Sequence, residues 1–262
     1  MRTYLSFSLK SFSSNLAYRS EVWLRIVSNF VAIFIQVAIW DAVIGESHVD
    51  GITLPVMITY SILNTLIASL LLTQVSSGVS SSLRSGSIAT ELIRPLSYPV
   101  YLFANGMGGV LYRIVFVAVP SLLAAWIFFD IERPASLFHL LAFIAGLIIA
   151  LGLSFMLGYL ISLLSFWLLT HFALDWTLAG IITVFSGSFL PLWFFPDSWA
   201  AIAHALPFQF LGYIPAALYL GYIPVGEIVW TLLLGAAWLL FFGLINQVLW
   251  WRAVRRLVVQ GG

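Results

Sequence analysis

The chain has 262 residues, of which 62% are hydrophobic and only 8% are charged, and its formal net charge is +1. Soluble domains carry about 25% charged residues, so this chain has too few charges to cover a water-soluble surface of its size. It contains no cysteine, which excludes disulfides and thiolate metal sites. Because the apolar residues come in long blocks, the sequence predicts an all-α membrane protein.

Residues 1–21 are interrupted by polar side chains and hold no compact apolar run or small-residue cleavage site, so no cleaved signal peptide is expected. Apolar and basic side chains are mixed here in a way that suits a helix lying in the membrane interface. The contributing residues are Tyr4, Phe7, Leu9, Lys10, Phe12, Leu16 and Arg19. The alternative is a frayed tail.

Residues 22–262 are expected to form one transmembrane domain with six spans. A helix needs about 20 apolar residues to cross a hydrocarbon core about 30 Å thick. Six blocks meet this requirement, at residues 22–44, 54–79, 101–129, 135–164, 172–194 and 228–251.

The basic residues predict the orientation, because Lys and Arg collect in cytoplasmic loops. On the six-span topology, one side holds Arg2, Lys10, Arg19, Arg25, Arg84, Arg94, Arg252, Arg255 and Arg256. The other side holds Arg133 and seven acidic residues: Asp41, Glu46, Asp50, Asp130, Glu132, Asp197 and Glu227. Both termini are therefore expected in the cytoplasm, which agrees with an even number of spans.

Polar side chains follow one face of span two and recur in span three. They are Asn64, Thr65, Ser69, Thr73 and Gln74 in span two, and Asn105 and Tyr112 in span three. Such groups could line a path for a substrate with polar groups or make interhelical hydrogen bonds, and the sequence favours neither role. The candidate path-lining residues are Asn64, Thr73, Gln74, Asn105 and Tyr112.

The segment 80–98, between spans two and three, has a helix-length stretch that stops at Arg94-Pro95, because proline disfavours a helical residue before it. Its apolar residues recur at i, i+4 and i+8, and its charged residues fall off that line. The apolar set is Ile88, Leu92 and Leu96, and the charged set is Arg84 and Glu91. This predicts a small amphipathic helix on the cytoplasmic face, with an ordinary connector as the alternative.

Two ionisable residues fall inside predicted spans, Arg113 in span three and Asp175 near the start of span five. Intramembrane charges are costly and usually face protein or a cavity. Both residues lie toward the cytoplasmic side, so we expect them to approach one another or to share a polar cluster. Asp175 could instead reach interfacial water.

Small residues recur every fourth position in span four, which allows another helix to approach closely. They are Ala142, Gly146, Ala150, Ser154, Gly158 and Ser162. The partner could be a helix of the same chain or of a second copy.

The segment 186–227 is apolar but is broken by five prolines and three glycines, so no unbroken span fits. Two short helices do fit, at residues 197–206, with Asp197 or Ser198 as N-cap, and at residues 208–220. Apolar half-helices must be covered by protein or lie at the interface, which predicts a re-entrant helical hairpin on the outer side. The alternative is a peripheral amphipathic loop.

Two stretches resemble bacterial ABC type-2 exporter permeases, in the six-span branch of similar length. The first contains Ser85-Gly86-Ser87-Ile88-Ala89, Leu92-Ile93-Arg94-Pro95-Leu96-Ser97-Tyr98-Pro99 and Tyr101. The second contains Ser186-Gly187, Pro191, Phe195-Pro196, Trp199 and Leu206-Pro207-Phe208. The resemblance covers the whole chain in topology and length but is sharp only in these stretches.

The resemblance implies a permease subunit of an ATP-driven exporter in the bacterial inner membrane. It implies that the loop 80–98 docks on a separate ATPase, through Arg84, Ser87, Glu91, Arg94 and Pro95, although these could be solvated surface residues. It also implies that the outer hairpin caps a path formed with a second copy or a related permease. ATP and magnesium would bind to the ATPase, and the partners would be protein and membrane lipid without nucleic acid.

The chain shows no catalytic motif of its own. A nucleotide-binding phosphate loop needs a lysine after a glycine-rich turn, and Lys10, the only lysine, follows no glycine. The four histidines form no metal-spaced pair, and no G-x-S-x-G turn is present. An enzyme is therefore disfavoured. A secondary transporter is the alternative, although no clear internal repeat supports it.

Overall fold

The structure is a computed structural model, and it describes residues 2–16, 19–44, 52–72, 78–79, 81–82, 87–93, 95–168 and 172–255. Within these residues, four stretches of helix are long and apolar enough to cross a membrane. They are α2 (Arg19–Ile44), the continuous stretch from α6 (Tyr98–Arg113) to α7 (Val119–Phe128), α8 (Leu137–Leu164) and α12 (Val225–Arg255). Two shorter apolar helices accompany them, α3 (Leu54–Leu70) and α9 (Phe172–Phe185). The predicted all-α membrane class is confirmed.

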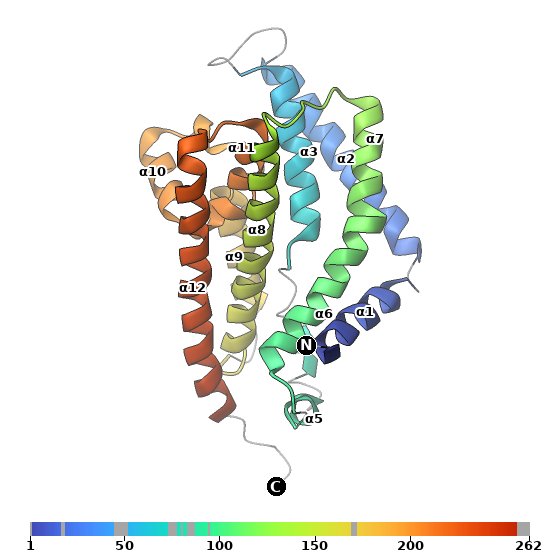
Figure 1. The fold of residues 1–262 in the computed structure, drawn as a ribbon, viewed down its shortest axis with the longest axis vertical. Helices are drawn as coiled ribbons and strands as arrows, with labels where there is room; N and C mark the ends of the chain where they lie inside the picture. Colours follow the sequence, from blue (N-terminus) through green and yellow to red (C-terminus); the bar gives the residue numbers. More distant parts are fainter. Residues whose placement is uncertain are drawn as a thin grey trace.

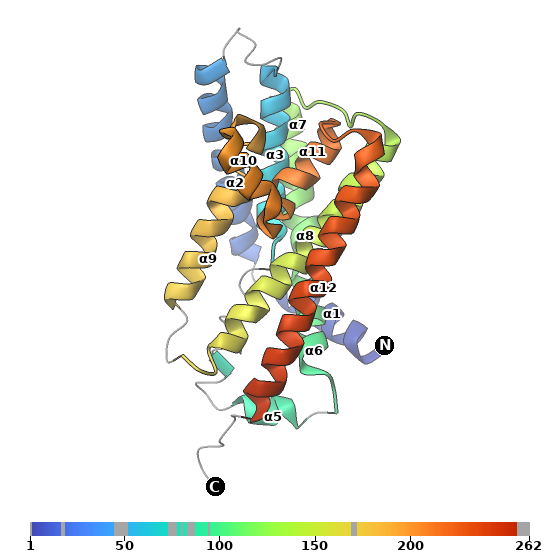
Figure 2. The same cartoon turned by 90° about the vertical axis from the view of Figure 1, so that its left-hand side faces the viewer.

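These helices form one elongated bundle (Figure 1). The short helix α5 (Ser87–Leu92) and the C-terminal end of α12 lie at one end of it. The helices α10 (Asp197–Ala205) and α11 (Tyr213–Leu220) lie toward the other end, as both Figure 1 and Figure 2 show. The N-terminal helix α1 (Arg2–Asn15) packs across α6.

The helix α3 ends at Leu70, well before the predicted end at residue 79. Leu71 leaves the helical conformation, with φ −57° and ψ 144°. The backbone groups released by this break are bound by side chains from other helices. Ser154 of α8 accepts a hydrogen bond from the Leu72 N–H at 3.0 Å, and Arg113 of α6 donates to the Leu70 carbonyl at 3.2 Å. Distant partners, which periodicity does not report, fix where this helix ends.

A short π-helical segment, η1 (Ile114–Ala118), joins α6 to α7. Pro120, the second residue after this segment, cannot donate the N–H of a regular turn, which gives a physical reason for the wider helix here. The third predicted span is therefore one helix with a local widening, and it begins at Tyr98 rather than at Tyr101.

The predicted small-residue stripe of α8 is packed inside the chain. All six of its members are buried, and α8 contacts α11 and α12. A Cβ atom on Gly146 would lie 3.1 Å from the Leu218 Cδ1 atom of α11, so the absence of a side chain permits this approach. The partner of the stripe is therefore the same chain, as one of the two alternatives expected.

The helix α9 also ends early, at Phe185 instead of residue 194. Gly187 has φ +69°, a conformation that favours glycine, and its carbonyl accepts a hydrogen bond from the hydroxyl of the fully buried Tyr60. The Ser186 carbonyl accepts a hydrogen bond from the Tyr213 N–H at 2.8 Å. This turn directs the chain back into the bundle.

The segment that was expected to form an outer hairpin consists of η2 (Leu192–Phe194), α10, η3 (Pro207–Leu211) and α11. The first predicted helix is confirmed as α10, but its N-cap is Pro196, so the expected capping role of Asp197 or Ser198 was wrong. The second predicted helix is split at Gly212. A Cβ atom there would lie 2.7 Å from Asn64 Oδ1 and 3.0 Å from the Ser186 carbonyl, so close packing on α3 and on the Ser186 turn separates η3 from α11.

We predict that Gly187→Ala destabilises the protein. The left-handed conformation costs an ordinary residue about 1–3 kcal/mol, and the new Cβ would lie 2.9 Å from the Tyr213 Cβ atom. Thermal unfolding of the detergent-solubilised protein measures the effect as a lower Tm. Gly243→Ala in α12 is the matched control, because a Cβ atom there meets nothing within 4 Å. Equal Tm values for the two variants would contradict the prediction.

Candidate functional site

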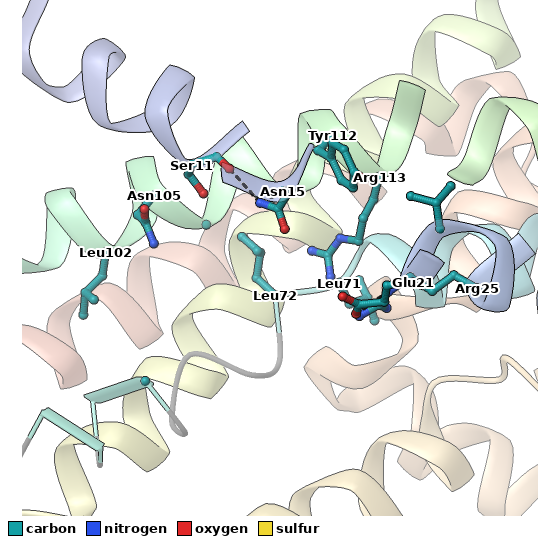
Figure 3. A pocket seen from close by; sticks show the side chains of 14 residues that line it. Ser11, Asn15, Glu21, Arg25, Leu71, Leu72, Leu102, Asn105, Tyr112 and Arg113 are labelled. Carbon is teal, nitrogen blue, oxygen red and sulfur yellow. Dashed lines mark hydrogen bonds and ion pairs between the residues drawn. The ribbon is translucent and has the colours of Figure 1, made fainter. Parts of the chain in front are cut away.

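A polar cavity of about 320 Å³ lies where α1, α2, α6 and the C-terminal end of α3 meet (Figure 3). It is lined by Ser11, Asn15, Glu21, Val22, Arg25, Leu71, Leu72, Gly78, Leu102, Asn105, Gly106, Gly109, Tyr112 and Arg113. A second cavity adjoins it and shares Glu21, Arg25 and Arg113. The two cavities together bring three charged side chains among the apolar helices.

The helix α1 forms one wall of the cavity and is held against α6 at a glycine. A Cβ atom on Gly108 would overlap the Ser8 carbonyl oxygen and would lie 2.7 Å from the Ser11 Cβ atom. Aromatic rings support the contact on both sides, with Phe7 edge-on to Tyr101 at 4.9 Å between ring centroids and Phe12 edge-on to Tyr112 at 5.9 Å. The predicted N-terminal helix is thus present, and part of its apolar face packs on protein.

Arg113 connects the cavity to the end of α3. Its Nη2 atom donates a hydrogen bond to the carbonyl of Leu70, the last residue of α3. A cation at the C-terminal end of a helix is favourable because the unpaired carbonyls carry partial negative charge. The Nε atom of Arg113 is buried and has no hydrogen-bond partner among the described residues. The side chain therefore retains at least one donor that no described residue accepts from.

Glu21 and Arg25, one helical turn apart on α2, form the other charged wall. The Arg25 guanidinium donates from Nη2 and Nε to the Glu21 carboxylate at 2.7 and 3.1 Å. Figure 3 shows the side chains of Arg113, Glu21 and Arg25 converging on one region. With the single carboxylate already bonded to Arg25, the charged lining consists of two cations and one anion.

Two of the predicted path-lining residues, Asn105 and Tyr112, line this cavity beside Arg113. Asn64 lies elsewhere: it is buried, its Nδ2 donates to the Tyr60 carbonyl, and its Oδ1 faces Gly212 of the outer segment. Thr73 and Gln74 lie outside the described residues. The sequence pattern suggested one polar face, but Asn64 is buried beside Gly212 and is not among the residues that line the cavity with Asn105 and Tyr112.

The structure places Arg113 beside α2 rather than beside Asp175. Asp175 is not among the residues that line either cavity, and its helix, α9, packs on η3. Within the described residues, no ion pair joins Arg113 to Asp175. The charged neighbours of Arg113 come instead from the N-terminal part of α2, which the sequence alone did not indicate.

The loop 80–98 contains a short helix, α5, as expected, but it ends at Leu92, so that Leu96 of the predicted apolar line lies beyond it. Ile88 is buried in a cluster with Val79 and Tyr98, and Leu92 packs against it. Glu91 accepts a hydrogen bond from the Ser82 hydroxyl at 3.3 Å, and Pro95 is exposed. Ser87 begins the helix, and its carbonyl accepts a hydrogen bond from the Thr90 hydroxyl at 2.7 Å. Arg84 and Arg94 lie outside the described residues.

Sequence reasoning missed Ile93, which is 82% exposed immediately after α5. A large apolar side chain this exposed at the end of the bundle is a candidate protein contact. The signal was present in the sequence, because Ile93 falls off the i, i+4 line that predicts the buried face.

The described residues contain no group of three or more side chains that could hold a metal ion. His139 is engaged structurally, with Nδ1 2.8 Å from the Ser136 hydroxyl and Nε2 3.3 Å from the Ile223 carbonyl. His204 lies 3.0 Å from the Gln209 amide oxygen. These contacts tie helix ends together.

We predict that Gly108→Ala loosens α1, because the new Cβ atom would overlap the Ser8 carbonyl. Lys10, the only lysine of the chain, lies in α1, so an endoproteinase specific for lysine reports on this helix alone. If the free energy needed to detach α1 from α6 falls by about 1 kcal/mol, the cleavage rate should rise roughly fivefold. Gly109→Ala, where a Cβ atom meets nothing within 4 Å, should cleave like the wild type. Equal rates for the two variants would contradict the predicted contact.

We predict that Ser154→Ala destabilises the protein by about 1–3 kcal/mol, because the Leu72 N–H loses its hydrogen-bond partner in the interior. Ser162→Ala is the matched control on α8, since that hydroxyl donates only to the Gly158 carbonyl of its own helix and both serines are fully buried. Equilibrium unfolding in mixed detergent and SDS measures the difference. A loss in the Ser162 variant as large as in the Ser154 variant would contradict the assigned role.

A family model described as ABC-2 family transporter protein matches residues 26–261, which is nearly the whole chain. Neither the search of curated proteins nor the search of solved structures returned a match. The chain therefore belongs to the ABC-2 transporter family.

Proposed function

We propose that this member of the ABC-2 transporter family is the membrane-spanning permease subunit of an ATP-driven exporter. The family match carries the proposal. The ATPase would be a separate chain, since Lys10 cannot complete a phosphate-binding loop here. ATP and magnesium would bind to that partner, and this chain would supply the translocation path.

In the proposed topology the chain crosses a bacterial inner membrane six times, with both termini in the cytoplasm. The end of the bundle with α5 also holds the C-terminal end of α12, which carries Arg252 and Arg255. The opposite end holds the α7–α8 connection, with Asp130 and Glu132, and the start of α12, with Glu227. This separation of charge supports a cytoplasmic α5. The helix α1 would then lie in the cytoplasmic interface.

The short helices α3 and α9 are about 26 and 21 Å long at 1.5 Å per residue, so neither spans about 30 Å of hydrocarbon unaided. Non-helical backbone at membrane depth has to be satisfied by protein. Ser154 and Arg113 form hydrogen bonds with the backbone at the C-terminal end of α3. Tyr60 and Tyr213 form hydrogen bonds with the backbone at the turn after α9. These contacts support two short spans, the second completed by a re-entrant outer hairpin.

A second permease, either another copy or a related chain, would complete the path. In the most apolar 18-residue stretch of α2, only 6% of the residues are buried inside the chain, whereas 50% are buried in the corresponding stretch of α8. The exposed apolar surface of α2 is therefore available to lipid or to a partner helix. The arrangement suits a path formed between two permeases above two ATPases.

The cluster beneath α5 suggests how ATPase motion would reach the spans. Ile88 packs with Tyr98 at the start of α6, and Tyr98 stacks on Trp250 near the end of α12, with 5.5 Å between ring centroids and 14° between planes. A push on α5 would therefore be transmitted to two long helices at once. We propose this cluster as the mechanical link, with Ile93 and the exposed surface around Pro95 facing the ATPase.

We predict that the tagged full-length chain co-purifies with an ATP-binding-cassette ATPase and that Ile93→Asp reduces the bound ATPase at least about tenfold, as expected when a central apolar contact is lost. Ile93 is exposed, so the fold should survive the change. Arg133→Ala, in the exposed α7–α8 connection, is the control and should bind normally. If no ATPase accompanies the wild type and membranes containing it show no ATP-dependent export, the proposal fails and a secondary transporter becomes the better assignment.

A further inference from the structure

The cavity of Arg113 has an excess of positive charge in an otherwise apolar region. The charged side chains among its described lining residues are Arg25, Arg113 and Glu21, so two cations face one anion. The neighbouring cavity has the same three charged residues. An uncompensated cation among membrane-spanning helices is costly unless an anion or water accompanies it. The lining therefore favours an anionic guest.

The geometry of Arg113 leaves donors for such a guest. One guanidinium nitrogen, Nη2, donates to the Leu70 carbonyl, while the buried Nε has no partner among the described residues. A guanidinium has five N–H donors in a planar fork that matches the oxygens of a phosphate group. Asn15, Asn105 and Tyr112 add polar side chains to the same cavity.

The second cavity adjoins these charged residues and is lined largely by side chains of α2. Its lining combines Ser28, Asn29 and Ser69 with the apolar side chains of Leu24 and Val117. The adjacent surface of α2 is apolar and open, with Trp23, Leu24 and Val27 exposed by 70, 68 and 57%. A molecule with a polar end and an apolar tail would find both environments within a few residues of α2.

We propose that the Arg113 cavity binds the phosphate group of an anionic amphipathic molecule that enters from the surrounding lipid. Small-ligand sites span about 300–1,000 Å³. The cavity volume of about 320 Å³ is enough for a headgroup but leaves the tail outside, against α2. The inference names the substrate class of the exporter and therefore rests on the proposed function.

The test measures lipid bound to the purified full-length chain by native mass spectrometry, after equilibration with phosphatidylglycerol and phosphatidylcholine at equal concentration. The wild type should prefer phosphatidylglycerol roughly tenfold, the value of one good charge-assisted contact. Arg25→Gln and Arg113→Gln should each remove most of that preference. Two arginine variants are used because Arg113 also holds the end of α3, whereas the partly exposed Arg25 does not.

Glu21→Gln gives a result of opposite sign. It removes the only carboxylate of the lining, so the preference for phosphatidylglycerol should rise roughly threefold or more. A purely structural role of the Glu21–Arg25 pair would instead lower binding. Arg133→Gln changes the net charge by the same amount as Arg25→Gln, but it lies outside both cavities and should bind as the wild type does.

The proposal is overturned if the wild type binds both lipids equally, if the two arginine variants keep the preference, or if Glu21→Gln weakens it. Millimolar inorganic phosphate separates the two possible sources of the anion: release of the bound lipid by phosphate would show a site for the free ion and overturn the lipid part. Retention of the lipid supports it. Because no ATPase is present in this measurement, its failure is distinct from failure of the chain to recruit an ATPase.

Discussion

The requirement that backbone polar groups find partners away from water governs this structure more than any other constraint. Two of its apolar helices stop short, α3 at Leu70 and α9 at Phe185, and each break releases carbonyl and amide groups. Arg113 and Ser154 bind the groups below α3, and Tyr60 and Tyr213 bind those at the Ser186–Gly187 turn. The helix ends, the turn after α9 and the Arg113 cavity all follow from how these groups are bound.

Arg113 therefore has two roles that reinforce one another. Its contact with the Leu70 carbonyl fixes the end of α3, and the same contact orients the guanidinium beside Arg25 and Glu21. If Arg113 served only to cap α3, its guanidinium would be expected to donate its hydrogen bonds to the unpaired carbonyls at the end of that helix. Here a buried Nε remains without a partner in the described part of the chain, so helix capping leaves capacity for a ligand. The same side chain therefore caps α3 and keeps a free donor among the described residues.

Composition and periodicity predicted the class of fold and the position of every long helix, because a membrane-spanning helix is specified by local apolar content. They also predicted α5 from Ile88 and Leu92 and the packing stripe of α8. They did not predict the early end of α3, the break at Gly212 or the place of Asn64. Each of these depends on a residue far away in the chain, such as Ser154 for Leu72 and Asn64 for Gly212. The charged cavity was half predicted, since Asn105, Tyr112 and Arg113 were singled out but α1 and α2 were not expected beside them.

The stack of Tyr98 on Trp250 also has a consequence for biosynthesis. The cluster that holds α5 needs an aromatic ring from the last helix, which leaves the ribosome more than a hundred residues after α5 itself. Until α12 has been made and inserted, Ile88 lacks part of its cover and α5 lacks a fixed position. A nascent chain would thus hold α5 in its final position only after its last helix is in place, so that this end of the bundle is completed at the end of synthesis.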